Sequence, residues 1–263
     1  MSLPFALKRA VPLTWKEAYH AHKSLPQNAL VRARNFLARR PPLPPAELIE
    51  LVAGHRNPEW FLRGGLSASE AIRGMVARNG GGMAKMKAVL DFGCGVGRIM
   101  RHWKGIKGPR FCGTDYNPRL VEWCRNNLKF AEFRTNTLDG PLSYDPETFD
   151  LVYAFSVFTH LTEPLQRHWM GELRRILRPG GLLYLTAHGD FYLDKLNEEE
   201  RRRFAAGELV VTDSERAGEN VCAAYHPRAY VEGTLAEGFE VLEYSPRGAR
   251  GDSDHDAYLL RKL

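Results

Sequence analysis

Residues 89–98, with the sequence VLDFGCGVGR, combine an acidic residue with closely spaced glycines. An apolar run ends at Asp91, and Gly93, Gly95 and Gly97 follow at every second position. Glycine permits positive φ angles and lets backbone N–H groups approach a ligand that a Cβ atom would exclude. The pattern therefore predicts a strand that turns into a helix around a bound ligand.

The acidic residue indicates the charge of that ligand. A dinucleotide-binding loop has the spacing G-x-G-x-x-G and places a pyrophosphate at the helix N-terminus, where a carboxylate at the strand end would repel it. Here the spacing is G-x-G-x-G, with Asp91 two residues ahead of the first glycine. A carboxylate in this place suits a ligand with an ammonium and a sulfonium group. S-adenosylmethionine has this charge pattern, and it is the cofactor that the sequence predicts.

A second acidic residue supports a nucleoside ligand. The short apolar run from Phe111 to Thr114, the next predicted strand after the glycines, closes on Asp115. Nucleotide-binding βαβ units place there, about 20 residues after the glycines, a carboxylate that accepts hydrogen bonds from the ribose hydroxyls. An alternative is that Asp115 caps a helix or closes a turn, because Asn117 and Pro118 follow it.

From Val89 to about Thr186 the sequence resembles the core of a class I S-adenosylmethionine-dependent methyltransferase, with residues 91–97 in the place of the D-x-G-x-G-x-G loop. The resemblance implies an α/β, Rossmann-like fold: a seven-stranded, mostly parallel sheet with helices on both faces. It also implies that Asp91 lies near the methionine amino group, that Asp115 holds the ribose and that Tyr116 packs on the adenine. The predicted cofactor-binding residues are Asp91, Gly93, Cys94, Gly95, Asp115, Tyr116, Asn136, Thr137, Phe155 and Ser156.

The sequence departs from the family at Asn136, where an aspartate commonly binds the adenine amino group. An amide oxygen accepts the same hydrogen bond without a charge, so the contact remains an expectation. The alternative is that Asn136 and Asp139 are turn residues.

Residues 149–155 are the predicted fourth strand, and the segment that follows them indicates which class of molecule accepts the methyl group. This nearly continuous apolar run is typical of a buried parallel strand, which delivers Phe155 and Ser156 beside the cofactor. Methyltransferases that modify base amines tend to carry Asn or Asp with Pro-Pro and an aromatic residue here. This chain has SVFTHL over residues 156–161, which disfavours base methylation.

His160 is the candidate catalytic base or pocket residue, with Thr159 and Ser156 as neighbours in the same pocket. Methyl transfer is an in-line displacement that mainly requires alignment and exclusion of water, and a base helps when the acceptor is a hydroxyl or a protonated amine. A structural or substrate-lining histidine is the alternative. Weaker candidates are His188 after the fifth strand and the pair Tyr225-His226, for which ordinary loop roles are the alternative.

No metal site is predicted. The segment DSDHD over residues 252–256 has the composition of a cation site, but its position before a terminal strand favours a solvated turn. The four cysteines, Cys94, Cys112, Cys124 and Cys222, have no C-x-x-C spacing, so we expect reduced thiols rather than disulfides or zinc ligands.

The length of 263 residues and the hydrophobic content of 44% suffice for one large α/β domain with additions. No apolar stretch approaches a membrane span, and the N-terminus lacks the apolar region of a signal peptide, so we expect a cytoplasmic protein. The net charge of +6 is concentrated in residues 1–40, which hold eight basic residues and one acidic residue. A solvated helical face, an acidic partner, a membrane surface or an anionic substrate would each account for it. Nucleic acid is not an expected partner, because the rest of the chain is not basic.

The predicted organisation has a helical N-terminal extension over residues 1–86 and a methyltransferase domain over residues 87–263. Helices are expected near 28–39 and 46–53, on either side of PPLPP, and from Ser67 or Ser69 to about Arg78. The extension is placed to form a lid over the cofactor, or it packs elsewhere. Residues 188–226, after the fifth strand, are predicted to form an insertion beside the substrate pocket. Further elements are expected as helices over 165–177 and 227–236 and strands over 182–187, 239–244 and 257–260.

The predicted activity is S-adenosylmethionine-dependent methylation of a small metabolite or sugar at oxygen or nitrogen. The alternatives are a nicotinamide-dependent oxidoreductase, a non-catalytic cofactor-binding scaffold and an RNA or protein methyltransferase. Intact glycines indicate that a ligand binds but do not indicate turnover, and a fold alone does not specify a function. The sequence does not specify the acceptor or the oligomeric state.

Overall fold

The computed structural model describes residues 29–251 and 253–263, and the chain divides into two compact units, residues 1–62 and residues 63–263. The division falls within helix α3 (Pro58–Arg78). Four of the N-terminal basic residues, Lys8, Arg9, Lys16 and Lys23, lie outside the described residues. The lid role of residues 1–86 stays a prediction.

The smaller unit contains the two helices expected on either side of the proline-rich connector. One spans residues 29–37 and the other is α2 (Ala46–Ala53). Arg32 of the first helix donates to the carbonyl oxygens of Leu43 and Pro44, at 3.2 and 2.7 Å. The prolines of the connector provide no N–H donors for backbone hydrogen bonds. The hydrogen bonds from Arg32 to the connector's carbonyl groups hold it against the helix instead.

Helix α3 begins about ten residues earlier than the sequence analysis predicted. The side chain of Asn57 caps the helix by accepting from the N–H groups two and three residues further on. The predicted start at Ser67 or Ser69 is wrong, since Ser69 lies buried inside the helix and donates to the carbonyl of Leu66. An asparagine before a proline in the first turn is the stronger helix start. The predicted exit at the glycines is confirmed, with Gly80 at φ +79°.

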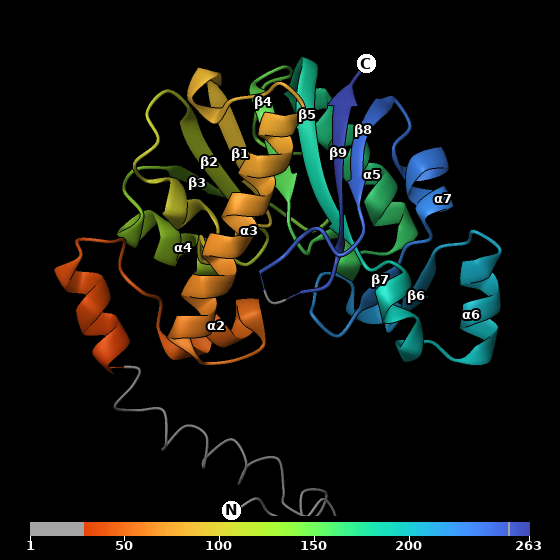
Figure 1. Cartoon of the computed structure of the whole chain (residues 1–263), viewed down its shortest axis with the longest axis horizontal. Coiled ribbons are helices and arrows are strands. Elements are labelled where there is room, and N and C mark those ends of the chain that lie inside the picture. The colour runs from red at the N-terminus through yellow and green to blue at the C-terminus, as the bar shows by residue number, and fades with distance from the viewer. Residues whose placement is uncertain (1–28, 252) are drawn as a thin grey trace, which may run out of the picture. The chain divides into compact units, whose positions relative to one another are not determined.

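The larger unit is built on a seven-stranded sheet with strand order β3-β2-β1-β4-β5-β9-β8 (Figure 1). The first five strands are parallel, and β9 is antiparallel to both β5 and β8. The predicted Rossmann-like fold is therefore confirmed. The strands are β1 (Ala88–Phe92), β2 (Arg110–Asp115), β3 (Glu132–Thr135), β4 (Phe149–Ala154), β5 (Leu177–Ala187), β8 (Phe239–Ser245) and β9 (Asp256–Lys262).

The two central strands are apolar on both faces because helices cover both sides of the sheet. Leu90 and Val152 belong to the core that includes Trp169 of α5 (Glu163–Ile176). Val89 and Leu151 belong to the core on the other face, with residues of α3 and of α4 (Pro118–Asn127). Figure 1 shows α3 in front of the sheet and α5 behind it. Since side chains alternate along a strand, Asp91 lies on the same face as Val89.

Residues 188–226 form the predicted insertion after β5. They contain α6 (Glu198–Ala205) and a two-stranded sheet of β6 (Val210–Thr212) and β7 (Ala223–Tyr225). A small core of Leu196, Phe204, Val210 and Tyr225 holds the insertion together. The expected helix over 227–236 is a short helix α7 (Arg228–Tyr230) followed by a π-helical turn (Val231–Leu235).

Strand β5 begins earlier than predicted, at Leu177 rather than Leu182. The Arg-Pro-Gly-Gly segment is a bulge within the strand, where the register with β4 shifts and Gly180 adopts φ +71°. Among the described residues, no helix is long and apolar enough to cross a bilayer.

Candidate functional site

The glycine loop follows β1 at the carboxyl edge of the parallel strands. Gly93, Gly95 and Gly97 all have positive φ angles, of +76°, +52° and +65°. A Cβ atom on Gly93 would lie 2.4 Å from Cγ2 of Val157, and one on Gly97 would lie 2.4 Å from Cδ1 of Leu128. Only glycine combines this backbone with this close packing.

The loop does not lead directly into the expected α-helix. Turns over residues 95–99 precede a 3₁₀ helix from Met100 to Trp103. The N–H groups of Gly93 and Cys94 both donate to the carbonyl of Thr114, at 2.8 and 2.9 Å. Cys94 itself is buried, so this predicted cofactor residue anchors the loop to β2 in the structure.

Asp91 is buried at the base of the loop, with 3% of its surface exposed. In the sheet it pairs with Gly113 of β2 on one side and Tyr153 of β4 on the other. Burial raises the pKa of Asp91 to about 8, and the nearby Asp115 carboxylate acts in the same direction, whereas Arg98 favours the charged form. A cationic group at this place would recover the lost solvation of the carboxylate.

Asp115 ends β2 and lies against the glycine loop. Its carboxylate accepts from the N–H groups of Gly95 and Asn117, both at 2.9 Å. Burial raises the pKa of Asp115, and these two hydrogen bonds oppose the shift. The carboxylate closes the turn before α4, whose cap is Asn117. A carboxylate has about four acceptor positions, so it can still accept from ribose hydroxyls.

The predicted adenine contacts lie at the ends of β2 and β3. Tyr116 is 41% exposed and its hydroxyl donates to the carbonyl of Gly218, at 2.9 Å. Asn136 accepts from the Thr114 hydroxyl at 2.7 Å and donates to the carbonyl of Thr137. These bonds place Asn136 beside Asp115 but occupy part of its amide, and its contact with adenine stays a prediction.

Phe155 and Ser156 follow β4 beside the loop. Phe155 is buried, and the Arg98 guanidinium lies 5.5 Å from its ring centroid. Ser156 has φ +58°, a left-handed conformation that costs a non-glycine residue free energy. Its N–H donates to the Thr186 hydroxyl at 2.8 Å, which holds it there. Residues in such conformations cluster at functional sites.

His160 lies where the sequence analysis expected it, just after β4 at the carboxyl edge. Its Nδ1 is 2.8 Å from the carbonyl oxygen of Cys222 in the insertion. A carbonyl oxygen only accepts hydrogen bonds, so Nδ1 carries the proton and Nε2 of the neutral ring carries the lone pair. Burial lowers the pKa of His160, which keeps the ring neutral at pH 7.

His160 belongs to a cluster of four histidines whose proximity was not predicted from the sequence. The ring of His188 lies 6.2 Å from that of His160 and 4.6 Å from that of His255. His226 is fully enclosed, and its Nε2 lies 3.2 Å from Oε1 of Gln166. Burial lowers the pKa of His188 to about 4 and that of His226 to about 3. These rings are therefore neutral imidazoles at pH 7.

The segment before β9 is a structural turn in the described residues. Asp256 is buried and accepts from the Tyr244 hydroxyl and the Arg247 N–H, both at 2.9 Å. Asp254 pairs with the Arg247 side chain, and residue 252 lies outside the described residues. No group of His, Cys, Asp and Glu in the described residues has the geometry of a metal site.

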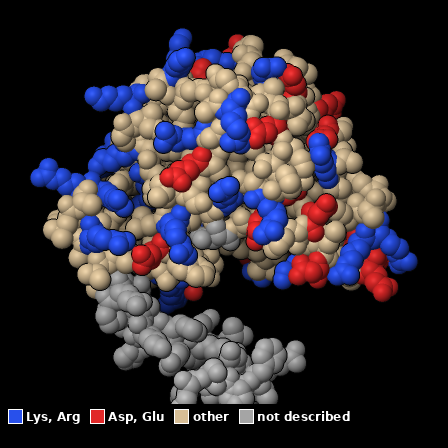
Figure 2. Space-filling view, viewed as in Figure 1, with Lys and Arg blue, Asp and Glu red and all other residues tan. Residues whose placement is uncertain are grey.

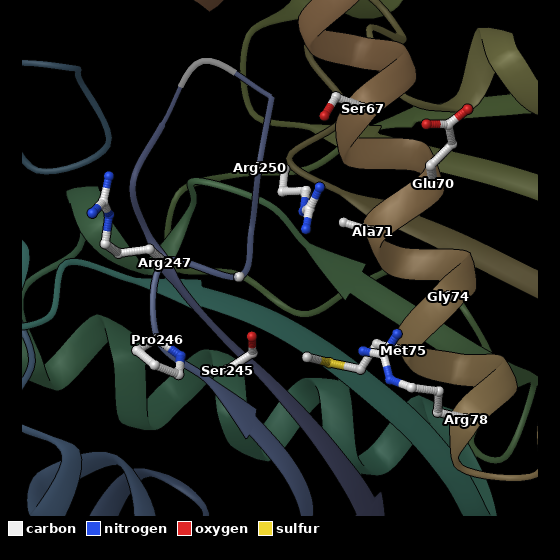
Figure 3. A pocket seen from close by; sticks show the side chains of 11 residues that line it. Ser67, Glu70, Ala71, Gly74, Met75, Arg78, Ser245, Pro246, Arg247 and Arg250 are labelled. Carbon is white, nitrogen blue, oxygen red and sulfur yellow. The ribbon is translucent and has the colours of Figure 1, made fainter.

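A cavity of about 320 Å³ lies between α3 and the loop that leaves β8 (Figure 3). Figure 3 shows the Arg250 side chain pointing from this loop toward α3. Two further arginines line the cavity, but Arg78 pairs with Glu243 and Arg247 pairs with Asp254. None of the predicted cofactor residues and none of the four clustered histidines lines it. Figure 2 shows acidic and basic side chains interspersed over this face of the molecule.

A protein-family model described as a methyltransferase domain matches residues 90–185. The chain is 28% identical over 169 residues to sterol 24-C-methyltransferase from Kluyveromyces lactis, which covers 62% of this chain and 43% of that protein. It is 27% identical over 106 residues to malonyl-[acyl-carrier protein] O-methyltransferase from Salmonella typhimurium, covering 38% of each. The chain thus spans less than half the length of these curated relatives.

Solved structures share the fold. An S-adenosylmethionine-dependent methyltransferase from Mesorhizobium loti superposes with a TM-score of 0.55 at 15% identity, covering 73% of this chain and 98% of that one. A methyltransferase from Leishmania major superposes with a TM-score of 0.53 at 13% identity, covering 74% of this chain and 71% of that one.

Proposed function

We propose that this chain, whose residues 90–185 match a methyltransferase-domain family model, is a class I S-adenosylmethionine-dependent methyltransferase that methylates an oxygen or nitrogen atom of a small metabolite or sugar. The observation that carries the choice of atom is the orientation of His160. Its Nδ1 donates to the Cys222 carbonyl, so its Nε2 is available to accept a proton. A base of this kind serves acceptors with a hydroxyl or a protonated amine.

The residues at the carboxyl edge fit the cofactor in charge and in space. When bound, S-adenosylmethionine supplies a methyl group activated by a sulfonium sulfur. Asp91 would pair with its ammonium group, which favours the ionised carboxylate and offsets the burial that raises the pKa to about 8. Asp115 would accept from the ribose hydroxyls, and the Gly93–Gly97 backbone would pass beneath them without side chains in the way.

The acceptor would lie beside His160, between the ends of β4 and β5 and the insertion. The insertion contributes the carbonyl that orients His160, and it shields the ring from water. Exclusion of water strengthens the electrostatic interactions inside the site and prevents side reactions. The neutral histidines offer hydrogen-bond acceptors to a hydroxyl or amine group of the acceptor.

A cytoplasmic location is part of the same proposal. All four cysteines lie in the described residues, and all are free and buried. Free thiols are typical of a reducing compartment.

The proposal is tested by a methyl-transfer screen of cell metabolites with labelled cofactor, run beside titrations with S-adenosylhomocysteine and NAD. We expect label in a small hydroxyl- or amine-bearing product and binding of the nucleoside thioether alone. Tight NAD binding without thioether binding would favour an oxidoreductase, and cofactor binding without any labelled product would favour a scaffold. Label in RNA or protein, with strongly salt-dependent binding, would contradict a small acceptor.

A further inference from the structure

His188 directly follows β5, His160 lies in the 3₁₀ turn after β4, and the two rings meet edge to face. Their centroids are 6.2 Å apart and their planes are nearly perpendicular, at 89°. His188 is 9% exposed, and its backbone carbonyl accepts from the N–H of His226. Two histidines from adjacent parallel strands thus meet at the carboxyl edge, where ligands bind in open α/β sheets.

One short strand of the insertion orients both rings. Nδ1 of His160 is 2.8 Å from the carbonyl oxygen of Cys222, and Nδ1 of His188 is 3.1 Å from that of Ala224. Ala224 lies within β7 and Cys222 directly precedes it, so the two carbonyls are only two residues apart along the chain. Each carbonyl requires a proton on Nδ1 and leaves the lone pair on Nε2. Figure 1 shows β7 at the end of the sheet where β5 finishes.

Neither Nε2 atom is used by the protein. In the part of the chain that the structure describes, no group forms a hydrogen bond with Nε2 of His160 or His188, and neither atom is sealed from solvent. Burial lowers the pKa of both rings, that of His188 to about 4. At pH 7 the pair therefore presents two hydrogen-bond acceptors and no donor.

Rings and one close backbone contact hold His188 in place. Tyr192 lies 4.4 Å from it, Tyr225 lies 5.4 Å and His255 lies 4.6 Å, all measured between ring centroids. The next residue, Gly189, has no room for a side chain, because a Cβ atom would lie 2.0 Å from Oδ2 of Asp256. The position of His188 is therefore fixed from three sides and from the backbone.

We propose that His160 and His188 form an acceptor subsite for a neutral molecule with two neighbouring hydroxyl groups. The proposal rests on the proposed function, and it names the acceptor class. A hydrogen bond from a hydroxyl to a ring nitrogen spans about 2.8–3.0 Å. Two acceptors on rings that lie this close therefore suit hydroxyl oxygens on adjacent or nearly adjacent carbons. The acceptor hydroxyl that binds His160 is the one that is methylated. The hydroxyl that binds His188 orients the acceptor and so determines which of its oxygen atoms reacts.

The proton and electron balance assigns different roles to the two rings. The hydroxyl oxygen on His160 gains the methyl carbon, its proton passes to Nε2 of His160, and the electrons of the broken carbon–sulfur bond remain on sulfur. His188 stays neutral, because a second proton beside a charged His160 is disfavoured. His188 is thus a binding and positioning residue, and His160 is the base.

The test compares binding of cis-1,2-cyclohexanediol and cyclohexanol to the full chain in the presence of S-adenosylhomocysteine, followed by NMR of ¹⁵N-labelled histidines. We expect both rings in the Nδ1–H form before addition, and about fivefold or greater preference for the diol, the contribution of one hydrogen bond. Equal binding of the two probes, no binding of either, or an Nε2–H form of His188 would overturn the subsite. The binding experiment requires no turnover. Failure of the diol subsite can therefore be distinguished from failure of the proposed methyl-transfer activity.

Two substitutions at position 188 separate binding from folding. In His188→Asn the amide can still donate to the Ala224 carbonyl but has no group at the place of Nε2, so we expect the diol preference to disappear. In His188→Gln the amide oxygen reaches the place of Nε2, so we expect part of the preference to return. His168→Asn, on α5 outside the cluster, is the matched control. A diol preference that persists in His188→Asn would contradict the proposal, as would its loss in the control.

Discussion

The proposed cofactor side and the proposed acceptor side of this site differ in charge and in how the chain assembles them. The cofactor side comprises Asp91, the glycine loop and Asp115, all within 25 residues of the sequence and on adjacent strands. The acceptor side comprises His160, His188, His226 and His255, which come from four separate segments. The first buries carboxylates that a cation would stabilise, and the second buries imidazoles that remain neutral.

Burial is the largest cause of the pKa shifts on both sides, but it acts on them in opposite directions. Burial raises the pKa of Asp91, so the carboxylate ionises readily only when a positive group arrives. Burial lowers the pKa of His160 and His188, so both rings are neutral at pH 7 and can accept hydrogen bonds. The same physical cause therefore supports the proposed cation site on one side and the proposed neutral acceptor site on the other.

The largest expected effect is on turnover, from His160→Asn. The asparagine amide can keep the hydrogen bond to the Cys222 carbonyl, but the base is lost, so kcat should fall by about 10²- to 10⁴-fold. Affinity for S-adenosylhomocysteine should be unchanged, because His160 belongs to the acceptor side. In the unsubstituted protein, kcat/KM should fall as the pH drops below the lowered pKa of His160. A kcat that is independent of pH and of this substitution would remove His160 from the mechanism.

Asp91→Asn should affect the cofactor side almost as strongly. Removing one partner of a buried ion pair costs about 3–5 kcal/mol, which corresponds to a loss in cofactor affinity of at least 100-fold. Folding stability at pH 7 should change little, since the Asp91 carboxyl is mostly protonated there without cofactor. Asp139→Asn, an exposed acid after β3, is the control and should bind normally. Calorimetric titration with S-adenosylhomocysteine checks both variants, and equal affinities would contradict the account.

The sheet and the cofactor side could be predicted from sequence because their signals are local. Strand–loop–strand spacing fixed the positions of Asp91 and Asp115, and the glycines specified positive φ. The acceptor side could not be assembled in this way. His255 lies in a turn whose local sequence resembles any solvated loop, and the Cys222 and Ala224 carbonyls have no side-chain signature at all. Their contacts depend on how a long insertion folds back on the strand ends.

The stability of the acceptor side should depend on pH. His188 and His226 have pKa values of about 4 and 3 in the folded chain, below the unfolded value of about 6.5. Unfolding therefore takes up protons below pH 6.5, and stability falls as the pH drops from about 6.5 toward 4. At pH 5 the loss should be about 2 kcal/mol for each histidine. Urea titrations at pH 7.5 and 5 measure it. His226→Gln should reduce the pH dependence and His168→Gln should not; the same dependence in both variants would contradict this assignment.

The smallest effect separates close packing from backbone strain in the glycine loop. Gly93 and Gly180 have nearly equal φ angles, of +76° and +71°, but a Cβ atom meets Val157 only at Gly93. Gly180→Ala should therefore cost about 1 kcal/mol from strain alone, and Gly93→Ala should cost about 1–3 kcal/mol more from overpacking. Denaturant unfolding measures both. Combining Val157→Ala with Gly93→Ala should recover part of the extra loss of unfolding free energy in Gly93→Ala. If nothing is recovered, the contact with Val157 does not cause that extra loss.

The measurement that tests the cofactor side most directly is calorimetry of S-adenosylhomocysteine binding at pH 7 in buffers of different ionisation enthalpy. Because the pKa of Asp91 is about 8 in the unbound protein, pairing with the ligand's ammonium group should release close to one proton. The release should vanish in Asp91→Asn, and NAD should not bind. Binding of S-adenosylhomocysteine without proton release, or tight binding of NAD in its place, would contradict the assignment of Asp91.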